Sequence, residues 1–140
     1  MERLKLNKNI SSVIPVELVL PAVGQGALGI EIHEENNFIH EILQQLHDEN
    51  TFLAVTAERA FLKKLEGGCQ VPIGAFAEVK TNGIYMDGFV GALDGTLSFR
   101  KKIRGKKSEA EKIGKLLAGD MIKAGAKEIL DEIYKNVRAK

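Results

Sequence analysis

The sequence predicts an α+β fold, a three-stranded antiparallel sheet that helices cover on one face, preceded by a short strand-containing segment. Two turn dipeptides, Asn82-Gly83 and Asp94-Gly95, divide the middle of the chain into three segments of alternating polarity, which indicates two successive hairpins. Helical periodicity flanks these segments on both sides. Helices and sheets that each have one apolar face bury those faces against each other, which gives two packed layers.

Two helices are predicted before the first strand. The first starts at about residue 36, where Asn36 or Asn37 can cap the free N–H groups of its first turn. The second starts near Thr51 and ends before Gly67-Gly68, because glycine commonly follows the last turn of a helix. Its side chains form two neighbouring stripes, one of Phe52, Val55, Arg59 and Leu62 and the other of Ala54, Ala57, Phe61 and Leu65.

The three predicted strands cover residues 73–80, 84–92 and 97–104. The last of them carries most of a basic run at 100–107 and forms one edge of the meander. Basic side chains on edge strands discourage pairing with another sheet. We therefore expect a solvated edge there rather than a phosphate-binding surface.

The C-terminal third is predicted to be helical. Ser108 and Glu111 have the spacing of a capping box. An apolar stripe follows, and Gly125 is expected to interrupt the helix before a second apolar stripe begins. The first stripe consists of Ile113, Leu116, Leu117 and Met121, and the second of Ile129, Leu130, Ile133 and Tyr134.

Residues 1–32 have a different pattern. The apolar runs at 16–20 and 30–32 are strand candidates, and a glycine-rich stretch separates them. Two short strands and a loop do not form a domain, so this segment is expected to pack against something outside the chain.

Composition excludes several classes of function. The 140 residues carry 20 basic and 19 acidic side chains, a balance that gives no reason to expect a nucleic-acid or membrane partner. No apolar stretch approaches the roughly 20 residues that span a bilayer, and we expect a cytoplasmic protein. One cysteine cannot form an internal disulfide, and with few histidines it predicts no metal site.

The glycine-rich stretch fits a dinucleotide-binding pattern at Gly24, Gly26 and Gly29. That function requires the glycines to begin a helix whose N-terminus faces the pyrophosphate. The residues that follow favour a strand instead. A close backbone turn that directs Gln25 into a site fits the pattern better, and a helix directly after Gly29 would reverse this interpretation.

Cys69 is the most informative residue. It lies in a predicted loop between helix and strand, where Gly67 and Gly68 allow a sharp bend and Pro72 stiffens the exit. Such a loop can present a thiol, and Arg59 on the preceding helix could supply positive charge. A single cysteine can equally be a small buried hydrophobe. The residue alone leaves both interpretations open.

Two longer segments carry a family resemblance. Residues 20–31 read LPAVGQGALGIE, and residues 56–60 and 65–74 read TAERA and LEGGCQVPIG. Together they closely resemble two segments of the porphobilinogen deaminases, also called hydroxymethylbilane synthases, in that family's order and at about its spacing. The resemblance spans nearly the whole chain.

The resemblance implies a transferase of tetrapyrrole biosynthesis that condenses four porphobilinogen molecules and releases ammonia. Its dipyrromethane cofactor would be joined to Cys69 by a thioether. A thiol suits this attachment, because loss of ammonia from porphobilinogen leaves an electrophile that a thiolate can attack. By the same match, Gln25, Gly67, Gly68 and Arg59 would line or support the cofactor site.

The family has three domains, and its acidic catalyst is expected upstream of this sequence. Residues 1–34 would then be the tail of domains one and two, and residues 35–140 the cofactor-attachment domain. The expected partners are porphobilinogen and the upstream domains of the same enzyme, which would be a monomer when whole. This piece alone would contain no catalytic residue and would be inactive. The rival hypothesis is a non-catalytic α+β binding or regulatory module in which Cys69 is structural.

Overall fold

The structure is a computed structural model that describes residues 2–66 and 71–138. Two 3-10 turns near the N-terminus, Glu2–Leu4 and Asn7–Asn9, precede the main elements. The main elements are, in order, α1 (Asn37–Gln44), α2 (Glu49–Lys64), β1 (Ile73–Lys80), β2 (Gly83–Gly91), β3 (Ser98–Gly105), α3 (Ala110–Met121) and α4 (Lys127–Arg138).

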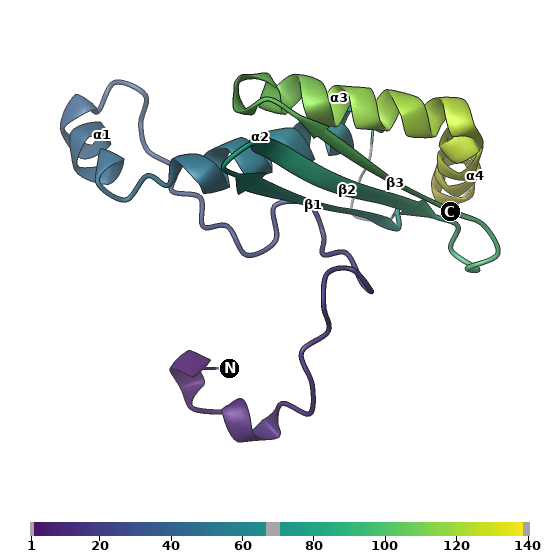
Figure 1. Cartoon of the computed structure of the whole chain (residues 1–140), viewed down its shortest axis with the longest axis horizontal. Coiled ribbons are helices and arrows are strands. Elements are labelled where there is room, and N and C mark those ends of the chain that lie inside the picture. Colours follow the sequence, from purple (N-terminus) through teal and green to yellow (C-terminus); the bar gives the residue numbers. More distant parts are fainter. Residues whose placement is uncertain (1, 67–70, 139–140) are drawn as a thin grey trace.

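The three strands form an antiparallel meander in the order β1-β2-β3 (Figure 1). Met86 of β2 lies between Ala77 of β1 and Ile103 of β3, which fixes the register across the sheet. Gly83 enters β2 with a φ of +137°, a conformation that side chains disfavour, and this explains why the Asn-Gly turn marks the hairpin. The predicted hairpins are confirmed, with strand ends within one residue of those expected.

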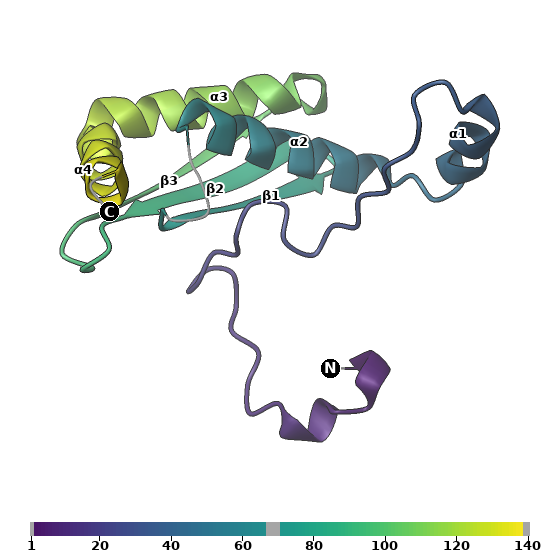
Figure 2. The same ribbon diagram turned by 180° about the vertical axis from the view of Figure 1, so that it is seen from behind.

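Helices α2 and α3 lie side by side over one face of the sheet (Figures 1 and 2). They approach closely because Gly114 of α3 faces the backbone of α2, where an added Cβ would come 2.0 Å from the Ala57 carbonyl oxygen. Their apolar stripes and the inward side chains of β1 and β2 form the core, in which Phe61, Ile84 and Leu117 are almost completely buried. The α+β fold class is confirmed.

The other two helices lie at opposite ends of this body (Figure 1). The short helix α1 is capped by Asn36, whose side chain accepts from the N–H of Ile39 at 3.1 Å, but it has no buried residue and does not cover the sheet. At the other end, Gly125 has a φ of +109° and turns the chain from α3 into α4. The predicted interruption at Gly125 is therefore confirmed.

Two local predictions were wrong. Residues 16–20 and 30–32 form no strand, and the segment runs as turns and irregular backbone away from the helix-covered face (Figure 2). A strand needs a neighbour to satisfy its N–H and C=O groups, and nothing in the described residues pairs with these two runs. The capping box also fails, because a 3-10 turn at Lys107–Glu109 moves the start of α3 to Ala110, whose N-cap makes no side-chain hydrogen bond.

The basic run lies where it was expected. β3 is an edge strand, and its outward-facing Arg100, Lys102 and Arg104 are exposed. Arg100 forms an ion pair with Asp87 of β2 at 2.8 Å. Among the helices that the structure describes, none is long and apolar enough to cross a membrane.

Candidate functional site

The glycine-rich stretch forms two overlapping tight turns. The N–H of Gln25 donates to the Ala22 carbonyl at 3.0 Å, and that of Ala27 donates to the Gly24 carbonyl at 3.3 Å. Gly24 and Gly26 have φ values of +70° and +87°, which residues with a side chain adopt only at a cost. The turns leave Gln25 exposed to solvent, as an amide directed into a shared site would be.

No helix follows Gly29 directly. The next residues are irregular, and α1 begins only at Asn37. The backbone N–H groups of the glycines therefore do not open a helix, and the dinucleotide-binding interpretation loses the feature that it requires.

Glu58 of α2 joins this turn to the sheet. One carboxylate oxygen accepts from the N–H of Gly24 at 2.7 Å, and the other accepts from the N–H of Ala77 in β1 at 2.8 Å. The side chain is only 6% exposed. Burial raises the pKa of Glu58 above its ordinary value, and the two N–H donors offset part of that effect.

Arg59, the next residue, points in a different direction from α2 and is exposed. The sequence favours an ion pair between Arg59 and Glu58 or another acid as an ordinary role for this arginine. The pairing with Glu58 is wrong, because neighbouring residues of a helix point about 100° apart and Glu58 faces the sheet edge. Arg59 instead lines a groove.

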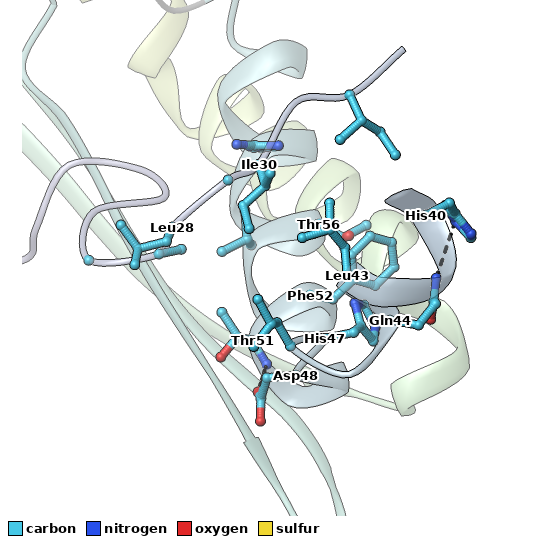
Figure 3. A pocket seen from close by; sticks show the side chains of 17 residues that line it. Leu28, Ile30, His40, Leu43, Gln44, His47, Asp48, Thr51, Phe52 and Thr56 are labelled. Carbon is cyan, nitrogen blue, oxygen red and sulfur yellow. Dashed lines mark hydrogen bonds between the residues drawn. The ribbon is translucent and has the colours of Figure 1, made fainter. Parts of the chain in front are cut away.

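That groove has a volume of about 620 Å³ and lies between the segment after the glycine turns, α1 and the first half of α2. Figure 3 shows Leu28 and Ile30 on one side and Thr51, Phe52 and Thr56 of α2 on the other. Leu28 is 99% exposed and Phe52 is 56% exposed, so the groove is open and largely apolar. Arg59 and Gly26 line it as well, which places the predicted arginine beside the glycine turns.

Cys69, Gly67 and Gly68 lie outside the described residues, but both flanks of their loop are described. Leu65 and Val71 are buried, at 3% and 8% exposure. Glu66 takes a positive φ of 55°, and its carbonyl accepts a hydrogen bond from the hydroxyl of Tyr134 in α4. The loop that carries the thiol therefore starts and ends at anchored points.

These pieces form one continuous arrangement along α2. The glycine turns contact the helix at Glu58, the groove contains Arg59, and the cysteine loop begins after Leu65. At a rise of about 1.5 Å per residue, Glu58 and Leu65 are roughly 10 Å apart along the helix axis. The Gln25 amide on the glycine turn and the Arg59 guanidinium on α2 could together bind an anionic molecule.

Similarity to known proteins identifies the family of this chain. A model described as "Porphobilinogen deaminase, C-terminal domain" matches residues 52–123. A second, described as "Porphobilinogen deaminase, dipyromethane cofactor binding domain", matches residues 1–41. A curated porphobilinogen deaminase from Carboxydothermus hydrogenoformans is 44% identical over 136 residues, which are 97% of this chain. The chain belongs to the porphobilinogen deaminase family.

The match covers only part of that relative. It includes 44% of the length of the Carboxydothermus porphobilinogen deaminase. The match to the cofactor-binding-domain model ends within α1 and contains the glycine turns. The match to the C-terminal-domain model starts in α2 and contains Glu58, Arg59 and Cys69. The hydrogen bond from Gly24 to Glu58 thus joins the regions matched by the two models.

Sequence reasoning missed the role of Glu58, although a signal was present. Ala54, Phe61 and Leu65 lie on one stripe of the helix, and Glu58 falls on the same stripe, four residues after Ala54 and three before Phe61. A carboxylate within an apolar helix face must find hydrogen-bond donors when it is buried. The donors were not identifiable from the sequence, because Gly24 and Ala77 are 34 and 19 residues away.

Proposed function

We propose that this chain is the C-terminal, cofactor-carrying part of a hydroxymethylbilane synthase, which condenses four porphobilinogen molecules into hydroxymethylbilane and releases ammonia. The observation that carries the proposal is the convergence of the two family segments in space. Gly24 of the first donates to Glu58 of the second at 2.7 Å, although the two are far apart in the sequence. Residues 1–34 would extend toward upstream domains, and residues 35–140 would form the attachment domain.

In this proposal Cys69 holds a dipyrromethane cofactor through a thioether, and the bound cofactor supplies a pyrrole carbon to which substrate is added. The described residues fit such a group. Arg59 offers an exposed guanidinium, which can form paired hydrogen bonds with the carboxylates of pyrrole side chains. Gln25 offers both a donor and an acceptor, and Gly67 and Gly68 would allow the loop to bend beside the cofactor.

The chain's own contribution to the reaction is tethering and orientation. A thiol on a loop with anchored ends keeps an attached molecule close to α2, so that each addition becomes effectively intramolecular. Leu65 and Val71 fix the ends of the loop through burial, and Tyr134 holds the Glu66 carbonyl. The proton-transferring acid would belong to the upstream part, as would further arginines that bind substrate carboxylates.

The exposed apolar residues of the N-terminal segment support the proposal that other domains of the same enzyme cover this segment. Val13 and Leu28 are 83% and 99% exposed, and exposed apolar clusters commonly mark interaction surfaces. Upstream domains of the same chain would cover them, and the whole enzyme would be a cytoplasmic monomer without nucleic-acid or membrane partners. The 140-residue chain by itself is expected to form no hydroxymethylbilane.

The test uses a fusion in which the upstream part of the Carboxydothermus relative precedes this chain. After incubation with porphobilinogen, intact-mass measurement and Ehrlich's reagent should detect a dipyrromethane on the protein. The matched Cys69→Ser fusion should lack it. A folded fusion without an adduct at Cys69 would favour the rival hypothesis, a non-catalytic α+β module with a structural cysteine.

A further inference from the structure

Glu58 is the single buried charged side chain among residues 2–66 and 71–135. Its two oxygens accept from Gly24 and Ala77, which belong to different parts of the fold. We propose that Glu58 is a positioning residue, whose carboxylate holds the glycine turn and the adjacent Gln25 at one place beside the sheet. The consequence for catalysis rests on the proposed function, whereas the contact itself can be tested without it.

Glu58 is presented from a rigid support. One residue before it, Ala57 is fully buried where α2 crosses α3 at Gly114. Three residues after it, Phe61 is fully buried above Gly88 of β2, where an added Cβ would come 2.8 Å from the ring. Close packing on both sides leaves this turn of α2 no room to shift. The carboxylate therefore projects from a fixed point.

The carboxylate completes the free edge of the sheet. β1 is an edge strand, and the N–H groups of Ala75 and Ala77 point away from β2. Ala75 donates to the Pro21 carbonyl at 3.1 Å, and Ala77 donates to Glu58. The segment before Gly24 is thus attached to β1 directly at Pro21 and through Glu58 three residues later.

Both groups that meet Glu58 are donors, so the position requires acceptors only. An ionised carboxylate has two oxygens and no hydrogen, which suits two N–H groups arriving from different directions. Glutamine has nearly the same shape, but its NH₂ group would face one of these N–H groups. Glutamine can therefore satisfy one contact at most, and this makes Glu58→Gln the most informative substitution.

Among the described residues, no stabilising ion pair explains the charge at Glu58. No lysine or arginine of the described residues lies within 4.0 Å of the Glu58 carboxylate. A buried carboxylate without a cation loses hydration that its hydrogen bonds only partly replace. Such a group selects one arrangement of its neighbours, here the position of the glycine turn.

The test measures amide hydrogen exchange by NMR in the 140-residue chain. In Glu58→Gln, protection of the Gly24 amide, of the Ala77 amide or of both should fall about tenfold or more relative to that of Met86 in the middle strand, because glutamine keeps one contact at most. Glu49→Gln, an exposed change on the same helix, should leave the ratio unaltered. Unchanged protection of both Gly24 and Ala77 in Glu58→Gln would overturn the proposal, and so would an equal loss at Gly24, Ala77 and Met86.

Wild-type protein gives an independent measurement if the variant does not fold. The Gly24 and Ala77 amide proton shifts should both change with pH along the same curve as the Glu58 carboxylate carbon. Amide shifts that ignore this titration would refute the contact.

In the fusion enzyme, Glu58→Gln should retain the adduct on Cys69 and lower kcat for porphobilinogen about tenfold, with less change in KM. An unchanged kcat would refute the catalytic consequence. A wild-type fusion without an adduct would refute the proposed function and leave the amide measurements to decide the role of Glu58.

Discussion

The sheet-and-helix body and the N-terminal segment use apolar residues in opposite ways. In the body, residues 49–135, Phe61, Ile84 and Leu117 are almost completely buried. In the segment, residues 2–36, Val13 and Leu28 are more than four-fifths exposed. Burial of apolar area is the main favourable term in folding. The body therefore contains its own source of stability, and the segment does not.

Polar contacts attach the segment to the edges of the body, and Val23 packs against the core. Arg100 donates to the carbonyls of Val16 and Glu17, Ala75 donates to Pro21, and Gly24 donates to Glu58. Hydrogen bonds of this kind add little to net stability but fix geometry. The comparison shows that the body is stable through its own core. A few polar contacts then determine where the glycine turns lie against it.

A matched pair of leucines should show the largest difference between the regions. Leu117→Ala in α3 removes a side chain that is 1% exposed and should lower the free energy of unfolding by about 2–5 kcal/mol. Leu28→Ala removes one that is 99% exposed and should change it by less than about 0.5 kcal/mol. Urea denaturation of the 140-residue chain measures both, and similar losses would show that the segment belongs to the same core.

The pH dependence of the unfolding free energy tests whether the Glu58 carboxylate stabilises the fold or only positions the glycine turn. Burial raises its pKa above the ordinary value of 4.5, so the folded protein binds the proton more tightly than the unfolded chain does. The associated stability is fully present below the unfolded pKa and is lost as the pH rises through the folded pKa. The loss is about 1.4 kcal/mol for each unit by which the pKa is raised.

Unfolding free energies of wild type and Glu58→Gln should therefore be compared from pH 4 upward. Wild type should lose stability relative to the variant as the pH rises through the folded pKa of Glu58. Parallel curves would mean that the carboxylate does not change its pKa on folding, and a relative gain would mean that its hydrogen bonds outweigh burial.

The body could be predicted from the sequence because its signals are local. Asn82-Gly83 defines a hairpin through the conformation of Gly83, and Gly125 turns the chain between two helices. The strands expected at 16–20 and 30–32 failed because a strand depends on a neighbour that local sequence does not describe. The role of Glu58 was missed for the same reason, because its hydrogen-bond donors come from distant segments. Gln25 and Arg59 lie within the described residues, but their roles in a cofactor site, like that of Cys69, stay predictions.

Removing the hydrogen bond at the start of the cysteine loop should have a smaller effect on the free energy of unfolding. Tyr134→Phe removes the hydroxyl that donates to the Glu66 carbonyl and should lower the free energy of unfolding by about 0.5–1.5 kcal/mol. Tyr85→Phe is the control, because its hydroxyl bonds to the exposed Asn82 side chain within the hairpin turn. Thermal or urea unfolding measures both, and equal effects would argue against a specific role for α4 in fixing the loop.

The smallest effect on global stability is expected at Arg100, although the segment should respond clearly. Arg100 contacts Asp87 of β2 and the carbonyls of Val16 and Glu17 at the same time. Lysine keeps the charge but has no planar fork that can reach several acceptors. In Arg100→Lys the urea midpoint should stay nearly constant, because lysine keeps a positive charge beside Asp87. Limited proteolysis after Glu17 should become severalfold faster, since local opening governs cleavage.

Arg104→Lys, on the same face of β3, should leave the cleavage rate unchanged. If Arg100→Lys also left it unchanged, Pro21 and Glu58 would be sufficient to hold the segment.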